Sequence, residues 1–181
     1  GKASVLRWNG DALPYADGLV NLVIVSKPGH VSKDEIMRVL APGGSAAAKQ
    51  GEKWAVSKKT ADPDTDEWTH FLHGPDNNAV ARDTEVGPPN HLQWSAPPRW
   101  TRDHDWTPSI FGAVTAGGRI FYIQDQGPIS IIDPRLPGRH ALVARDAHNG
   151  VLLWKRTIPS WYPSMVIWGT VPVYMNRRVV A

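Results

Sequence analysis

The stretch Ala144-Arg145-Asp146-Ala147-His148-Asn149-Gly150-Val151-Leu152-Leu153-Trp154 has the pattern of strand, tight turn and strand. Asn149-Gly150 favours a hairpin, because Asn and Gly both accept the positive φ that a tight turn requires. The Asp146 side chain is able to accept hydrogen bonds from backbone N–H groups two residues on and so fix the turn. We therefore predict that residues 141–145 pair antiparallel with residues 151–155.

The spacing Ala144-x-Asp146-x-x-x-Gly150-x-x-x-Trp154 resembles the tryptophan docking motif of the PQQ-type (quinoprotein) β-propellers. The four named residues are called the docking motif below. In that family the Trp of one blade packs against the neighbouring blade, so the resemblance implies that Trp154 is largely buried. The opening segment 67–78, with Trp68, Phe71, Gly74-Pro75 and Asn78, is also similar to the family's bacterial members, as are segments 91–94 and 113–122.

This resemblance covers residues 67–181 and implies the first one to two blades of a β-propeller, an incomplete set. A propeller has typically 4–8 blades of four strands each. The remaining propeller blades would then come from a longer polypeptide or from a partner protein chain. The chain opens at Gly1-Lys2 without Met and stops inside a strand-like run, so we expect a fragment of a longer protein.

Residues 1–57 have an α/β pattern. Residues 19–25 form an apolar run between glycines, which is typical of a buried parallel strand. Ser32 followed by Glu35 three residues later predicts a capping box and a helix over 32–40 that stops before Pro42. Residues 45–49 and 54–57 are expected to form a final strand or hairpin.

Within that part, residues 13–23 and the segment Glu35-Ile36-Met37-Arg38-Val39-Leu40-Ala41-Pro42-Gly43-Gly44 resemble the last third of a class I S-adenosylmethionine-dependent methyltransferase. The family's acidic residue near the adenine is replaced here by Asn9, with Asp11 two positions later. The Gly-rich cofactor loop has no counterpart. The resemblance implies a degenerate methyltransferase-like segment in which Asn9 and Asp11 are the candidate cofactor-binding residues.

The expected fold class is therefore an α/β N-terminal part, the C-terminal portion of a Rossmann-like methyltransferase fold, followed by a mostly β part with one to two propeller blades. The expected organisation is a methyltransferase-like segment at 1–57, a Pro/Gly-rich linker and opening segment at 58–91, and blade sequence at 92–181.

Composition excludes several classes of function. The chain has no Cys, which rules out disulfides, thiolate metal sites and c-type haem attachment. The net charge is only +3 and no dense Lys/Arg run occurs, so nucleic-acid binding is not expected. No long apolar window predicts a membrane span. No signal peptide is present in this chain, and the propeller resemblance implies a periplasmic or secreted protein.

Three polar clusters are candidates for chemistry. Asp103-His104-Asp105 is able to bind a metal or run acid–base catalysis, or to serve as a solvated loop with turn hydrogen bonds. His70 and His73 would share one face of a helix and could ligate zinc, but Gly74-Pro75 follows and favours loop packing instead. Trp94, Trp100 and Trp106 could line a pocket or pack between strands.

Three functions follow from the resemblances. The first is a non-catalytic binding or assembly scaffold. The second is part of a quinone-dependent dehydrogenase, in which PQQ with Ca²⁺ would sit in the complete propeller. The third is a methyltransferase remnant with residual cofactor binding. No confident catalytic, cofactor or metal residue emerges, and we do not expect the chain alone to be a self-sufficient enzyme.

Overall fold

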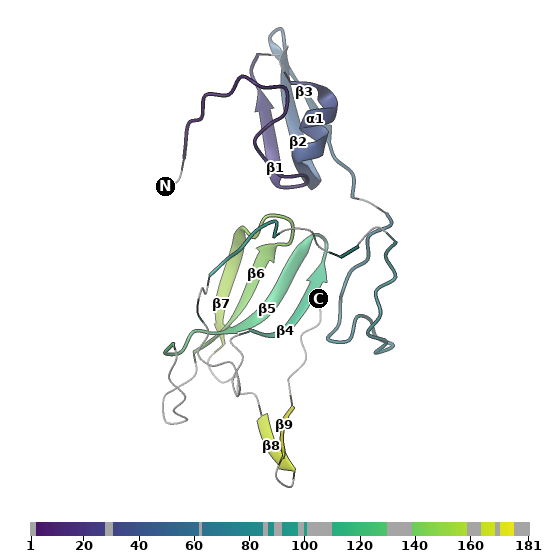
Figure 1. The fold of residues 1–181 in the computed structure, drawn as a ribbon, viewed down its shortest axis with the longest axis vertical. Helices are drawn as coiled ribbons and strands as arrows, with labels where there is room; N and C mark the ends of the chain where they lie inside the picture. Colours follow the sequence, from purple (N-terminus) through teal and green to yellow (C-terminus); the bar gives the residue numbers. More distant parts are fainter. Residues whose placement is uncertain are drawn as a thin grey trace. The chain divides into compact units, whose positions relative to one another are not determined.

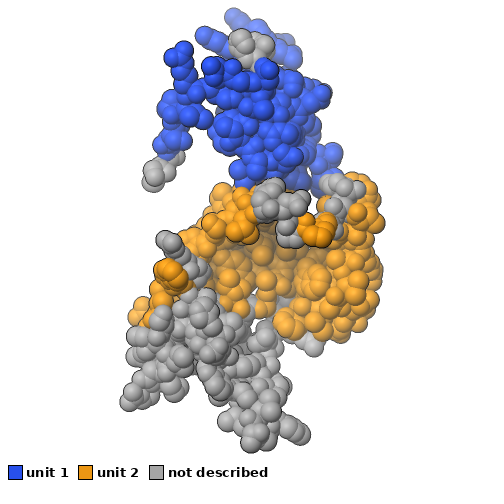
Figure 2. Space-filling model, in the orientation of Figure 1, with its two compact units in different colours: residues 1–62 blue, residues 63–181 orange. Residues whose placement is uncertain are grey.

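The computed structural model describes residues 3–27, 31–61, 63–84, 87–88, 92–97, 100, 110–129, 139–158, 164–168 and 171–175, the last two ranges and Phe111 for their backbone alone. The chain divides into two compact units, Gly1–Asp62 and Pro63–Ala181 (Figure 2). Each unit is considered separately below.

The first unit is a three-stranded sheet with one helix. Its strands are β1 (Val20–Val25), β2 (Leu40–Gln50) and β3 (Lys53–Lys58), and α1 (Lys33–Val39) connects the first two (Figure 1). β1 pairs with β2 in parallel, and β2 pairs with β3 in antiparallel register. Of the two alternatives for residues 45–57, a final strand or a hairpin, the structure has the hairpin, and Gly51, at φ +61°, supplies the left-handed residue of its turn.

The predicted helix begins where the sequence indicates. The Ser32 hydroxyl accepts a hydrogen bond from the Glu35 backbone N–H at 3.1 Å, which is the N-cap half of a capping box. The reciprocal half does not form, because the Glu35 carboxylate instead accepts the Leu13 N–H at 2.5 Å and pairs with Arg38. The helix ends at Val39, before Pro42, since Leu40 already has extended backbone.

Arg38 connects the helix to the segment that precedes β1. Its guanidinium donates to both carboxylate oxygens of Glu35, at 2.7 and 2.6 Å, and to the backbone carbonyl of Tyr15 at 3.0 Å. It also pairs with Asp17 and reaches the Leu13 carbonyl. The hydrogen bond from Arg38 lowers the pKa of Glu35 to about 2, against the opposing effect of partial desolvation.

The expected Rossmann-like α/β part is wrong. The described chain is nearly all β, with one helix of seven residues. A doubly wound fold needs parallel strands covered by helices on both faces. Here β3 is antiparallel, and the β1 side chains of Leu22 and Ile24 are 55% and 62% exposed. β1 is thus parallel as expected, but it is not a buried strand.

The second unit contains a four-stranded antiparallel sheet in sequence order. Its strands are β4 (Ile110–Ala116), β5 (Arg119–Asp125), β6 (His140–Asp146) and β7 (Leu152–Ile158). β8 (Ser164–Trp168) and β9 (Val171–Met175) form a separate pair. The predicted hairpin of β6 and β7 is confirmed: Val143 lies opposite Lys155 and Ala144 opposite Trp154.

A propeller is not confirmed. The described residues contain a single four-stranded sheet, and β8 with β9 form only two strands. Segments 92–95 and 4–8 both have irregular backbone.

The core of the sheet lies along β5 and β6. Val143 and Ala144 are fully buried and Ala141 nearly so, and since 143 and 144 point to opposite faces, β6 is covered on both sides. Tyr122 packs with Ala141 and Val143 on one face, and Ile123 packs with Leu142 and Ile158 on the other. Burial ends abruptly at β7, where every residue from 152 to 157 is exposed.

We expect Ser32→Ala to weaken α1 locally by about 1 kcal/mol, the ordinary value of an N-cap hydroxyl. Hydrogen exchange of the α1 amides, followed by mass spectrometry on the full chain, should then accelerate about fivefold. Ser4→Ala, in an exposed irregular segment, is the matched control and should leave exchange unchanged. Equal exchange in the two variants would contradict the capping role of Ser32.

Candidate binding site

The turn of the docking motif is built by Asp146. Its Oδ1 accepts hydrogen bonds from the backbone N–H groups of His148 at 2.9 Å and Asn149 at 3.2 Å. The Gly150 N–H donates to the Asp146 carbonyl at 2.9 Å, which closes the turn. The role predicted for Asp146 is confirmed. Gly150 takes φ +70°, a conformation that L side chains rarely adopt.

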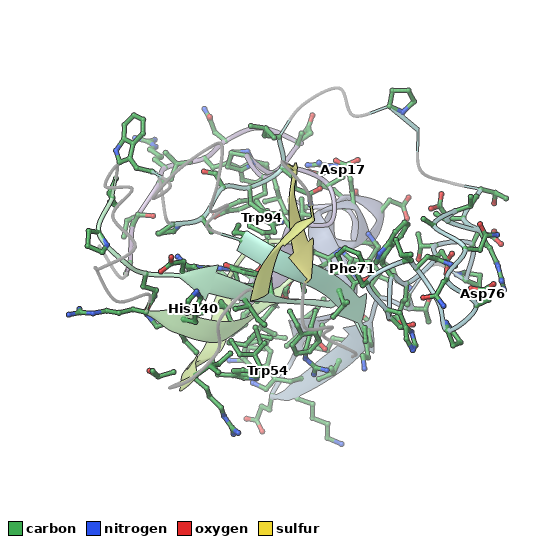
Figure 3. The ribbon with its side chains drawn as sticks, turned by 90° about the horizontal axis from the view of Figure 1, so that it is seen from below. Asp17, Trp54, Phe71, Asp76, Trp94 and His140 are labelled. Carbon is green, nitrogen blue, oxygen red and sulfur yellow. The ribbon has the colours of Figure 1, made fainter. Side chains whose placement is uncertain are left out.

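Trp94 packs directly onto Gly150. A Cβ atom at position 150 would lie 2.3 Å from Cε3 and 2.6 Å from Cδ2 of the Trp94 ring. The indole Nε1 donates to the Ala147 carbonyl at 2.9 Å, and Gln93 Nε2 donates to the His148 carbonyl at 3.0 Å (Figure 3 marks Trp94). Gly150 is therefore required twice, by its own φ and by the indole of an irregular segment that rests on it.

Arg145 joins the same cluster from inside the sheet. Its side chain is buried and donates to the Tyr122 hydroxyl at 2.8 Å, to the Gly150 carbonyl at 2.8 Å and to the Pro97 carbonyl at 3.4 Å. Among the described residues it forms no ion pair with a carboxylate. Neutral acceptors alone thus satisfy this buried cation, and they hold segment 93–97 against the β6–β7 turn.

Trp154 lies in β7, the last strand of the sheet. Within this chain it is 37% exposed, while Ala144 opposite it is fully buried. Its ring lies 6.1 Å from that of Phe121, tilted by 46°, and the Arg156 guanidinium lies 5.5 Å from its centroid. No neighbouring blade is present among the described residues, so burial of Trp154 by a partner stays a prediction.

A second cluster surrounds His73, in the irregular segment 63–84. His73 is only 5% exposed and takes φ +69°. Its Nε2 lies 2.6 Å from Oδ2 of Asp66, which also accepts the Arg82 N–H at 2.6 Å. The Trp68 ring meets the imidazole edge-on at 5.2 Å. Asp66 thereby ties together both ends of the segment from 66 to 82.

These contacts favour loop packing over metal binding for His70 and His73. The two residues form an isolated antiparallel bridge, not a helical pair, and His70 Nδ1 lies 2.9 Å from the Thr69 hydroxyl. The part of the chain that the structure describes contains no group of three His, Cys, Asp or Glu able to hold a metal. His73 Nδ1 is buried and has no hydrogen-bond partner among those residues.

The charge state of Asp66 follows from its hydrogen bonds. The backbone N–H of Arg82 and, second, the His73 ring lower the pKa of this carboxyl, against partial desolvation. An ionised carboxylate only accepts hydrogen bonds, so the network assigns the proton to His73 Nε2. An imidazole held by a carboxylate, as His73 is by Asp66, is an arrangement that also occurs in general bases. Here, however, the other ring nitrogen, His73 Nδ1, is buried and cannot reach a substrate.

The remaining candidates are not brought together. Asp103, His104, Asp105 and Trp106 lie outside the described residues. Asn9 and Asp11 are exposed in the irregular segment before β1. Trp100 is exposed. In the described ranges, no helix has the length and apolar character needed to cross a membrane.

Sequence reasoning missed Asp66, Arg145 and the contact of Trp94 with Gly150. Asp66 lies seven residues from His73 and sixteen from Arg82, a spacing that no local rule predicts. Trp94 was expected in a strand or pocket. The only available signal for the contact of Trp94 with Gly150 was the glycine itself. A glycine at that position indicates either a positive φ or the close approach of another group.

Comparison of the chain with protein-family models, with curated proteins and with solved structures finds no match.

We expect Gly150→Ala to destabilise the second unit by about 2–4 kcal/mol, the sum of an unfavourable φ and a clash with a packed ring. Hydrogen exchange in β5 and β6 measures the loss. Gly117→Ala is the matched control, since Gly117 has φ +58° and meets only the flexible end of Arg119 at 3.5 Å. It should cost about 1 kcal/mol. Equal losses in the two variants would show that Trp94 does not constrain Gly150.

We expect Asp66→Asn to loosen segment 66–82 in a pH-dependent way. Because the folded pKa of Asp66 lies below its unfolded value, its stabilising effect is full above the unfolded pKa of about 3.9 and is lost as the pH falls through the lowered folded pKa. The stability difference between wild type and variant should therefore shrink as the pH falls below the unfolded pKa, measured by urea unfolding monitored through Trp fluorescence.

Asp76→Asn is the control for this experiment. Asp76 lies in the same segment, in an exposed ion pair with Arg82, and extends away from the sheet (Figure 3). Its replacement should produce a small effect with little pH dependence. A pH profile of Asp66→Asn that parallels that of Asp76→Asn would overturn the role given to Asp66.

Proposed function

We propose that this chain is a non-catalytic binding or assembly scaffold. The observation that supports it is the contrast between two adjacent strands: β6 is buried on both faces, while β7 exposes Leu152, Leu153 and Trp154 by 37–47%. Apolar side chains of this size on both faces of one strand are typical of a surface that a partner covers. The resemblance to the tryptophan docking motif, whose Trp packs against a neighbouring module, agrees with this proposal.

The best-formed polar cluster also favours a scaffold over an enzyme. Catalysis by an imidazole needs a ring nitrogen within reach of a substrate. His73 Nδ1 is enclosed, and Nε2 is engaged by Asp66. The Arg145 guanidinium likewise donates its hydrogen bonds to the Tyr122 hydroxyl and the Gly150 carbonyl. Among the described residues, these two side chains therefore hold loops in place.

Site-specific crosslinking tests the proposal. A photoreactive phenylalanine analogue at Leu153, introduced in the cells that produce the full protein, should form a covalent adduct with a polypeptide. The control position is Val56, which is 70% exposed in the other unit. We expect an adduct at 153 that disappears when Leu152 and Trp154 are both replaced by Ser, and none of comparable yield at 56.

The alternatives are tested on the same protein. Addition of PQQ with Ca²⁺, followed by absorbance and dye-linked alcohol oxidation, tests the quinone-dependent dehydrogenase, and calorimetry with S-adenosylmethionine tests the methyltransferase remnant. Quinone-dependent turnover, or equal crosslinking at 153 and 56, would overturn the scaffold proposal.

A further inference from the structure

We propose that the open edge of β7 receives an extended strand of a partner, in which an apolar residue pairs with Trp154 and two consecutive carboxylates pair with Lys155 and Arg156. The proposal rests on the scaffold function and names the class of partner. It uses the recognition mode in which a peptide adds a strand to a sheet edge.

The two edges of the sheet differ. At β4, the Thr115 N–H donates to the Trp68 carbonyl at 2.7 Å and the Trp68 N–H donates to the Thr115 hydroxyl at 2.7 Å. The Gly117 N–H is taken by the Glu67 carboxylate. Segment 67–68 therefore occupies that edge. β7 stands at the other end of the strand order, with no neighbour beyond it among the described residues (Figure 1).

An edge strand presents unpaired N–H and C=O groups to any strand that can approach. The devices that usually block such an edge are proline, a bulge, a covering loop or charged side chains, lysine above all. Lys155 and Arg156 are charges of this kind, and they oppose a cationic strand but attract an acidic one. β7 contains no proline, and the irregularity in its register lies at its first residues, between the pairs Ala144–Trp154 and Arg145–Leu152. From Trp154 to Ile158 the ladder is regular, so this part of β7 is able to template a further strand.

The side chains of β7 indicate what that strand carries. Lys155 and Arg156 are adjacent, so they project to opposite faces of the sheet. Among the described residues neither forms an ion pair, and the Arg156 guanidinium lies 5.5 Å from the centroid of the Trp154 ring. Directly opposed charges of opposite sign stabilise a cross-strand pair, and like charges destabilise it. A partner with carboxylates on both faces at this point is complementary.

A second copy of β7 fits less well. An antiparallel two-fold pairing centred between the charged residues would set Lys155 opposite the Arg156 of the other copy, cation against cation. A pairing centred on Trp154 would instead place Lys155 opposite Leu153 and Arg156 opposite Leu152. Neither register supplies a carboxylate, so charge complementarity favours a strand of different sequence.

The test uses a defined peptide and the full chain. The peptide is acetylated and amidated and reads Thr, Glu, Glu, Val, Val, Val, Thr, so that in antiparallel register its glutamates meet Arg156 and Lys155. A second peptide has lysine in place of both glutamates. We expect the acidic peptide to bind about fivefold more tightly or better, measured by fluorescence anisotropy, with affinity falling as salt rises.

Reversal of the two β7 charges in the protein provides the decisive experiment. With Lys155→Glu and Arg156→Glu together, the preference should reverse toward the lysine peptide, provided exchange in β6 shows an intact sheet. If that double variant fails to fold, N-methylation of alternate residues in the acidic peptide replaces it and should abolish binding.

Equal binding of both peptides, or binding that survives N-methylation, would overturn edge pairing. Absence of peptide binding with persistent crosslinking at 153 would reject this partner class and leave the scaffold function standing. If no crosslink forms at position 153 but the acidic peptide binds in a charge-dependent way, the scaffold function in cells is rejected. The β7 edge would then still be able to bind an acidic strand.

Discussion

The second unit depends on the absence of a side chain at Gly150. The turn of the β6–β7 hairpin needs a positive φ there, and the Trp94 indole occupies the space where a Cβ would lie. The same turn offers its carbonyls to Trp94 Nε1 and to the buried Arg145 guanidinium. A single glycine thus fixes the hairpin, docks segment 93–97 and completes the hydrogen bonding of a cation that would otherwise be costly to bury.

The first unit uses an arginine for a related purpose. Arg38 extends from the last turn of α1 and binds two backbone carbonyls and the Asp17 carboxylate of the segment before β1. Because those acceptors come from an irregular stretch, the guanidinium replaces the regular backbone pairing that the stretch lacks. In both units, long polar side chains rather than secondary structure hold the connecting segments, which agrees with the many turn-forming residues of the sequence.

The sheet of the second unit is closed on one side and open on the other. Segment 67–68 covers β4, and the Asp66–His73 contact anchors the loop that follows it. β7 has neither a covering segment among the described residues nor burial on either face. Apolar area removed from water contributes about 25 cal/mol per Å². A partner that covered the exposed Leu152, Leu153 and Trp154 side chains would therefore gain binding free energy. This asymmetry supports the proposal of a scaffold that meets a partner along one edge.

Local sequence determined the features that depend on neighbouring residues only. Ser32 specified the start of α1, Asp146 and Asn149-Gly150 specified the hairpin turn, and Gly117-Gly118 specified the turn between β4 and β5. Each is set by backbone φ or by a hydrogen bond across two or three residues. The tertiary structure alone decided that β1 is exposed, that Trp154 lies at a sheet edge, and that Asp66 meets His73. Burial and long-range pairing depend on which elements pack together in the folded chain. Neither the hydrophobic pattern of a segment nor the spacing of a motif encodes which elements those are.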